Sequence, residues 1–210
     1  MASDAIEQAI IMGNIASISV DVNNMLDRGT SSHEILNDHL LPGMAVVGER
    51  FKKNEMFLPQ VLMSAQAMQT AIDILKPHLA QSSDARQRHT VIIGTVKGDM
   101  HDIGKNLVRI MLVGAGFEVV DLGVNVPAQR FLDTAKEHKA SVVCLSALLS
   151  STMNNMKEVV DVFKTSDLEN TRILIGGAPV SSEFSKSIGA DAYAPTAPAA
   201  VEKVQEFCSN

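Results

Sequence analysis

The hydrophobic periodicity of the chain changes near residue 90, and this change limits the folds that are possible. Before about residue 80, apolar residues recur at the spacing of one helix face, as in Ile35, Leu36, Leu40, Met44 and Val47. After residue 90, short β-branched runs such as TVIIGTV and SVVCLSAL alternate with amphipathic segments. The sequence therefore predicts a helical region followed by an α/β region.

The first region is expected to form a four-helix bundle. Four segments have helical periodicity, at residues 3–13, 17–28, 31–53 and 58–80; Gly29 ends the second, and Pro59 lies in the first turn of the fourth. The polar stretch QSSDARQRH follows without periodicity at 81–89, which is typical of a linker. We assign a helical bundle cap to residues 1–82, a linker to 83–89 and an α/β domain to 90–210.

The second region is expected to form a flavodoxin-like, five-stranded, parallel, doubly wound sheet. Its apolar runs predict strands at 90–96, 118–123, 141–148, 172–177 and 191–195, and helices lie between them and after the last. Strands as uniformly apolar as these are covered on both faces, which favours the strand order 2-1-3-4-5. In this order the loops after the first and third strands, GDMHDIG and LSSTM, face each other across one crevice.

Composition excludes several classes of partner. The net charge is -6 and the chain has no tryptophan, so nothing in the composition indicates a basic surface that would bind a polyanion. We therefore expect no nucleic acid partner. The two cysteines form no C-x-x-C pair, which fits a reducing cytoplasm. The N-terminal stretch MASDAIEQAI is not a signal peptide, and no run of apolar residues is long enough to span a bilayer. We therefore expect a soluble, cytoplasmic protein without a membrane partner.

The loop GDMHDIG places Asp99 two residues before His101 at a strand end. That carboxylate can accept a hydrogen bond from one imidazole nitrogen and leave the other free to bind a metal. A structural loop histidine with a turn hydrogen bond is the alternative. Phosphate-binding glycine motifs are missing, and so are the extra histidines or cysteines that a bare zinc ion requires. A metal at His101 would therefore have to arrive already chelated.

Three short motifs follow one another along the chain at defined spacings. D-x-H-x-x-G is followed after 41 residues by S-x-L, and after 27 more residues by G-G. These motifs place Asp99, His101, Gly104, Ser146, Leu148, Gly176 and Gly177. The pattern resembles the cobalamin-binding domain of methionine synthase, of methylmalonyl-CoA mutase and of the corrinoid proteins of methyltransferase systems.

The resemblance implies a cobalamin, or related corrinoid, bound in the base-off/His-on form, with methylcobalamin present during turnover. His101 would be the metal ligand, and His101, Asp99 and Thr152 would be the catalytic residues. The other implied cofactor contacts are Met100, Asp102, Ile103, Gly104, Gly123, Ser146, Leu148, Gly176 and Gly177.

Several of these contacts have specific implied roles, each with a structural alternative. The glycines would leave room for the nucleotide tail of the cofactor, and Ser146 would hydrogen-bond its buried benzimidazole. Thr152 matches a hydroxyl that contacts the aspartate in methionine synthase. As alternatives, Gly123 serves an ordinary turn, Ser146 satisfies backbone groups at a strand end, and Thr152 is a helix N-cap.

The helical region carries a second resemblance. Residues 40–68 are similar to the helical cap that shields the cobalt-bound methyl group in methionine synthase and in corrinoid carriers, and that mutases lack. Phe57 and Leu58 would cover the cofactor. The segment departs from the carriers at Asn54, where glycine is common, and at Gln60, where glutamate is common.

The resemblance also implies a role for the chain. Its 210 residues hold no barrel that could bind a methyl donor, so it resembles the methyl carrier of a three-component system of anaerobes, not catalytic alone. Its partners would be a substrate:corrinoid methyltransferase, a methylcorrinoid:acceptor methyltransferase that uses tetrahydrofolate or coenzyme M, and a reductive activase. The donor would be a methoxylated aromatic (O-demethylation), a methylamine, a betaine or methanol. A cobalamin-dependent regulator and a mutase small subunit are the alternatives, although the chain shows no basic helix-turn-helix.

Overall fold

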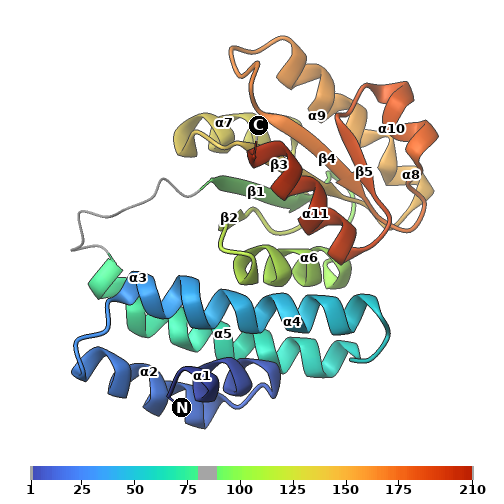
Figure 1. Ribbon diagram of the computed structural model, residues 1–210. Coiled ribbons are helices and arrows are strands. Elements are labelled where there is room, and N and C mark those ends of the chain that lie inside the picture. Colours follow the sequence, from blue (N-terminus) through green and yellow to red (C-terminus); the bar gives the residue numbers. More distant parts are fainter. Residues whose placement is uncertain (1, 80–88, 210) are drawn as a thin grey trace. The chain divides into compact units, whose positions relative to one another are not determined.

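The computed structural model describes residues 2–79 and 89–209, which form two compact units (Figure 1). The first unit is built from the helices before residue 80. The second is built around a sheet and contains residues 89–113 and 117–209. Across the described ranges, no helix combines the length and the hydropathy needed to cross a membrane.

The first unit is the predicted helical bundle. Its helices are α1 (Ala2–Ile11), α2 (Ile15–Asp27), α3 (Ser32–Glu34), η1 (Ile35–Leu40), α4 (Leu41–Lys52) and α5 (Leu58–Leu79). Because α3, η1 and α4 follow one another without a break, they form a single rod that packs with α1 and α5, while α2 packs with the same two helices. The centre of the bundle is apolar, with Ile10, Ile18, Leu40, Val61 and Met68 almost fully buried.

The predicted helix 31–53 is not α-helical throughout, because Ile35–Leu40 form a π-helix. The N–H of Leu41 bonds to the carbonyl of Leu36, five residues earlier. Pro42 follows directly and has no N–H to donate into an α-helical turn. The π-helical turn therefore ends directly before Pro42, the residue that cannot donate a backbone hydrogen bond.

The two departures from the carriers have local structural explanations. Asn54 adopts a left-handed backbone conformation, with φ at +58°, which asparagine tolerates better than most residues other than glycine. The side chain of Gln60 accepts a hydrogen bond from the N–H of Phe57 at 2.9 Å. This contact satisfies a free donor at the start of α5, as a glutamate would in a capping box.

The second unit is a parallel sheet with the predicted order. Its strands are β1 (Thr90–Thr95), β2 (Glu118–Asp121), β3 (Val142–Ser146), β4 (Arg172–Gly176) and β5 (Ala192–Ala194). They pair in the order β2-β1-β3-β4-β5, which confirms the flavodoxin-like arrangement. Strand β1 is buried throughout, whereas β2 is partly exposed because it is an edge strand.

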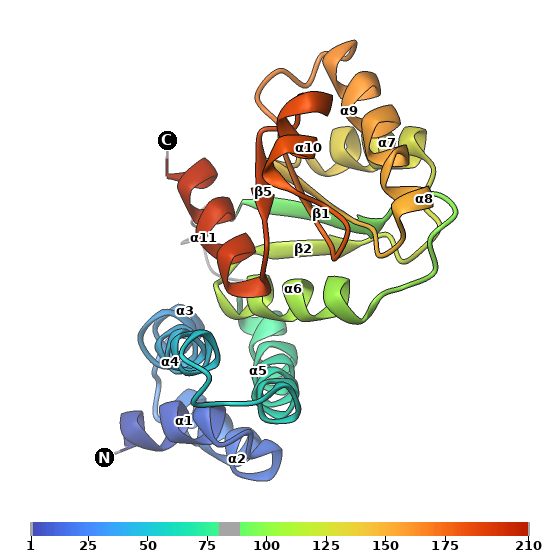
Figure 2. The same ribbon diagram turned by 90° about the vertical axis from the view of Figure 1, so that its right-hand side faces the viewer.

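Helices cover both faces of the sheet (Figures 1 and 2). On one face lie α6 (Ile103–Gly114) and α11 (Ala197–Cys208), and their apolar residues form one core with the sheet. On the other face lie α7 (Ala128–His138), α9 (Asn155–Lys164) and α10 (Ser182–Ile188), which form a second core. The predicted helix 152–168 is divided into α8 (Ser150–Met153) and α9.

The ring of Phe131 in α7 fills the second core where that helix crosses β1. Its side chain is fully buried, and a Cβ atom added at Gly94 would lie only 2.8 Å from the ring. The glycine in the middle of a buried strand is thus explained by the close approach of an aromatic side chain.

Replacing Phe131 with alanine should lower the free energy of unfolding by about 3 to 5 kcal/mol, because it removes a buried ring and leaves a cavity. Urea unfolding followed by circular dichroism measures the change. Phe57→Ala is the matched control, since that ring is 69% exposed and its loss should cost less than about 0.5 kcal/mol. Equal losses for the two variants would contradict this description of the core.

Candidate functional site

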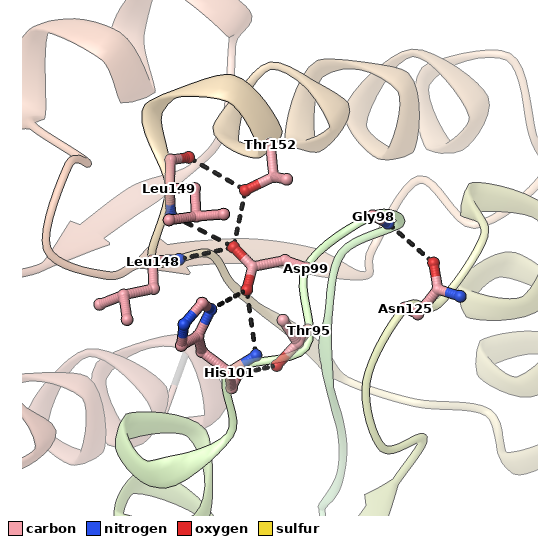
Figure 3. Close-up of polar contacts among 8 residues, drawn as sticks. All are labelled: Thr95, Gly98, Asp99, His101, Asn125, Leu148, Leu149 and Thr152. Carbon is pink, nitrogen blue, oxygen red and sulfur yellow. Dashed lines mark hydrogen bonds and ion pairs between the residues drawn. The ribbon is translucent and has the colours of Figure 1, made fainter.

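The loops that follow β1 and β3 meet at the carboxyl edge of the sheet. The two strands are neighbours, with Thr95 paired to Ser146, and the N–H of Val96 continues the ladder to the carbonyl of Ser146 at 3.0 Å. The predicted strand order places the loops together, and the structure brings Asp99, His101 and Thr152 into one hydrogen-bonded group (Figure 3).

The carboxylate of Asp99 is the centre of this group and has no exposed surface. Its Oδ1 accepts from the backbone N–H of His101 at 3.1 Å and from the imidazole Nδ1 at 2.8 Å. Its Oδ2 accepts from the N–H groups of Leu148 at 2.8 Å and Leu149 at 3.2 Å, and from the Thr152 hydroxyl at 2.6 Å. Five donors from two loops and one helix therefore converge on one side chain.

These donors determine the charge of Asp99 and the position of the proton that it shares with His101. Burial alone would raise the pKa of Asp99, but the hydrogen bonds from Thr152, Leu148 and His101 outweigh it and hold that pKa well below its usual range. An ionised carboxylate can only accept, so the proton in the shared bond belongs to His101 Nδ1. The lone pair of Nε2 is then available to a ligand, and the His101 side chain is 49% exposed.

Thr152 lies inside α8 and not at its N-cap, which is Leu149. Its hydroxyl donates to Asp99 and is also 3.0 Å from the carbonyl of Leu149. The alternative of a simple N-cap is therefore wrong for this residue.

A cavity of about 380 Å³ lies on the α6 and α11 side of the sheet, within the range of about 300 to 1,000 Å³ typical of small-molecule sites. Its lining combines four of the predicted residues, Gly104, Ser146, Gly176 and Gly177. Its apolar wall includes the side chain of Cys144, whose thiol has a pKa raised by burial to about 12. Gly123 is not part of the lining, because it follows β2, on the other side of β1 from the strands beside the cavity.

The glycines of the three motifs are required for different reasons. Gly177 has φ at +133°, and a Cβ atom there would lie 1.8 Å from the carbonyl oxygen of Ala147. A Cβ atom at Gly176 would lie 3.0 Å from the carbonyl oxygen of Ala194. The neighbouring backbone thus already demands glycine at position 177, without a bound tail, and leaves little room for a side chain at position 176. At Gly104, by contrast, an added Cβ atom would meet nothing within 4 Å.

Large apolar side chains are exposed beside the imidazole. Met100 is 67% exposed and Ile103 is 76% exposed, and Leu148 and Leu149 are also exposed. Apolar groups gathered in this way at one edge of a sheet are typical of a binding surface. Throughout residues 2–79 and 89–209, no group of three or more histidine, cysteine or acidic side chains is arranged to hold a metal ion.

Two polar residues of the site have no clear signal in the sequence. Lys105 is almost fully buried, and its Nζ donates to both carboxylate oxygens of Asp121, at 2.7 and 2.6 Å, and to Asn106 at 2.7 Å. Asn125 contacts the backbone of the loop that carries Asp99. In a sequence, a lysine in an amphipathic helix and an asparagine in a loop are typical of the solvent-exposed surface. The partners at Asp121 and in the loop of Asp99 lie far away along the chain and come near only in the folded protein.

The fold and site define a class of protein: a doubly wound α/β domain that presents a carboxylate-bound imidazole and a cavity at the same edge of its sheet. Residues 89–204 match the family described as B12 binding domain, and residues 2–76 match a second family with the same description.

Similar proteins cover nearly the whole chain. A corrinoid protein of Desulfitobacterium hafniense is 38% identical over 95% of this chain and 94% of its own length. Dimethylamine corrinoid protein 1 of Methanosarcina acetivorans is 41% identical over 83% of this chain and 82% of its own. Among solved structures, one from the methanol:cobalamin methyltransferase complex of Methanosarcina barkeri matches with a TM-score of 0.91 at 29% identity, over 100% of this chain and 80% of that one. The chain belongs to the corrinoid proteins with a B12-binding domain.

The low pKa of Asp99 predicts a pH-dependent contribution to stability. Because the folded-state pKa lies below the unfolded value of about 3.9, the contribution is complete above that pH and is lost as the pH falls through the folded-state value. Asp99→Asn should therefore lower the free energy of unfolding by about 2 to 4 kcal/mol at pH 7. The amide NH2 group, which is a donor, would replace one carboxylate oxygen and face the N–H and O–H donors that surround it.

Urea unfolding of wild type and Asp99→Asn at pH 7, 5, 4 and 3 measures this effect. The difference between the two proteins should stay constant from pH 7 to 5 and shrink below about pH 4. Asp102→Asn serves as the control and should show a small difference, because the Asp102 carboxylate is exposed and accepts one hydrogen bond, from the side chain of Asn106. A difference for Asp99→Asn that persists undiminished at pH 3 would show that the carboxylate is not the ionised centre described above.

Proposed function

We propose that this protein carries a methyl group on the cobalt of a bound corrinoid between two methyltransferases. The observation that carries the proposal is the His101 imidazole, which is fixed by the ionised Asp99 through Nδ1 and leaves Nε2 available at the edge where the cavity lies. One methyltransferase would transfer the methyl group from a donor to the corrinoid, and the other would pass it to tetrahydrofolate or coenzyme M. A reductive activase would be the third partner.

The residues present fit a corrinoid in the base-off/His-on form. His101 would hold the cobalt through Nε2, and the bond to Asp99 would fix its tautomer and increase its basicity as a ligand. The cavity, with Ser146 and the open face of Gly104, would hold the nucleotide tail. The exposed Met100 and Ile103 would lie beneath the corrin ring. When bound, the corrinoid supplies a cobalt centre that accepts and releases a methyl group.

The relatives support a role in methyl transfer from small donors. They include the dimethylamine corrinoid protein and the trimethylamine corrinoid protein 1 of Methanosarcina acetivorans, which is 39% identical over 86% of this chain. The solved structure from a methanol:cobalamin methyltransferase complex supports a methyltransferase as the partner. We infer that methylamines and methanol are the first donors to test, before betaines and methoxylated aromatics.

The helical unit favours a carrier over a mutase subunit. Residues 2–76 match a family described as B12 binding domain in addition to the α/β domain. We propose that Phe57, which is exposed, and the half-buried Leu58 cover the upper face of the corrin.

The reaction itself distinguishes the proposed carrier from a regulator or a mutase subunit. Reduced protein loaded with cobalamin is mixed with each methyl donor and its methyltransferase, and the corrinoid spectrum is followed. A carrier should gain a methylated corrinoid only when a donor and its enzyme are both present. Failure with every donor and enzyme pair would overturn the proposal.

Replacing His101 with alanine should remove the axial imidazole without unfolding the protein, because the side chain is half exposed. The spectrum of the bound cobalt(III) corrinoid should lose its His-on form, and the dissociation constant should rise by at least about tenfold. His138→Ala, at an exposed histidine in α7, is the matched control and should behave like wild type. An unchanged spectrum and affinity for His101→Ala would rule out His101 as the ligand.

Two glycine substitutions distinguish an effect on the stability of the fold from an effect on corrinoid binding. Gly104→Ala should be at least as stable as wild type, because the new methyl group meets open space in a helix. It should nevertheless weaken corrinoid binding, because that methyl group occupies part of the cavity. Gly177→Ala should lose about 2 kcal/mol or more of stability, because its Cβ atom collides with the Ala147 carbonyl.

Thermal unfolding of the apo-proteins and equilibrium binding of cobalamin measure the two effects. If Gly104→Ala binds cobalamin as tightly as wild type does, the cofactor does not occupy the part of the cavity beside α6.

A further inference from the structure

Asn125, in the loop after β2, holds the backbone of the loop that carries Asp99 and His101. Its side-chain Oδ1 accepts a hydrogen bond from the N–H of Gly98 at 2.8 Å (Figure 3). Its own backbone N–H donates to the carbonyl of Asp99 at 2.9 Å. One residue therefore binds the groups on either side of the Gly98–Asp99 junction.

Asn125 itself is fixed by the sheet. The N–H of Val126 donates to the carbonyl of Thr95 at 2.9 Å, and Val96 and Val126 form a parallel bridge beyond the ends of β1 and β2. Asn125 has φ at +54°, a left-handed conformation that costs most residues about 1 to 2 kcal/mol and that asparagine tolerates. The conformation turns both its N–H and its side chain toward the neighbouring loop.

Apart from Asn125, the loop at Gly98 is held by hydrogen bonds and not by tight packing; one of them runs from the N–H of Asp99 to the carbonyl of Val96 at 3.1 Å. Gly98 also has a positive φ, +80°, and a Cβ atom there would meet only ordinary contacts, at 3.6 Å from Thr152 and 3.9 Å from Asn155. The side-chain N–H of Asn155 donates to the carbonyl of Lys97 at 2.6 Å, so Asn155 and Asn125 bind the two ends of the same Lys97–Gly98 peptide group. The position of the Asp99 backbone therefore depends on hydrogen bonds and not on close packing around Gly98.

We propose that Asn125 is a positioning residue that keeps the Asp99 carboxylate aligned with the imidazole of His101. It contacts neither the imidazole nor the carboxylate and acts through the peptide backbone of Gly98 and Asp99. Loss of its acceptor frees that backbone to rotate, and the carboxylate then meets Nδ1 less often. The imidazole consequently spends more time with its proton on Nε2, where it cannot bind a metal. The effect on corrinoid binding rests on the proposed function, whereas the effect on the imidazole does not.

Two variants isolate the side-chain acceptor. Asn125→Gly preserves the backbone N–H and tolerates the left-handed conformation, but it removes the oxygen that Gly98 requires. Asn125→Asp keeps an oxygen in the same place and should restore the wild-type behaviour. Both variants should unfold within about 4 °C of wild type, because a single exposed hydrogen bond is at stake.

The first measurement is the two-bond proton–nitrogen NMR correlation of the His101 ring in the apo-protein at pH 8, which shows which nitrogen carries the proton. Wild type and Asn125→Asp should show the Nδ1–H form, and Asn125→Gly should show an increased share of the Nε2–H form. The second measurement is the dissociation constant for cobalamin, which should rise about tenfold in Asn125→Gly, the lower end of effects seen for residues that orient metal ligands.

An Asn125→Gly protein with the wild-type tautomer and affinity would overturn the assignment. So would an Asn125→Asp protein that folds but fails to restore the Nδ1–H form. If wild type binds no corrinoid at all, the proposed function fails, while the NMR comparison of apo-proteins still tests the role of Asn125.

Discussion

The buried carboxylate of Asp99 is the interaction on which the rest of the site depends. Leaving a charged group without solvent is costly unless hydrogen bonds replace the water, and five donors do so here. Four of the five would exist without the imidazole, since they come from backbone groups and from Thr152. The protein thus stabilises an ionised acceptor first, and the tautomer of His101 follows from it.

The strand order makes this convergence possible. Because β3 is adjacent to β1, the N–H groups of Leu148 and Leu149 reach Asp99, and because β2 lies on the other side of β1, Asn125 reaches Gly98. The ion pair between the buried Lys105 and the more exposed Asp121 joins the first turn of α6 to the end of β2. The loop with His101 is therefore held from both neighbouring strands, which fixes the imidazole relative to the sheet.

Periodicity and spacing predicted the parts of this structure that depend on local patterns. The strand order, the helical bundle and the bond between Asp99 and His101 follow from apolar periodicity and from two side chains placed two residues apart. The π-helix at Ile35–Leu40 and the role of Asn125 were missed, because each depends on where a particular backbone group lies in three dimensions. For the same reason, no pattern could show that the carbonyl of Ala147 is what excludes a side chain from Gly177.

The residues of the three motifs consequently fall into two groups that sequence spacing alone does not separate. Gly177 and Thr152 serve neighbouring parts of the protein whether or not a ligand is bound, and Gly176 lies close to the carbonyl of Ala194. Within the described residues, the open space at Gly104, the half-exposed His101 imidazole and the exposed Ile103 side chain have no evident role in the fold itself. A glycine in a helix and a large exposed apolar side chain each reduce stability or solubility. Features that the fold does not need, gathered at one edge of a sheet, are best explained by the ligand that covers them.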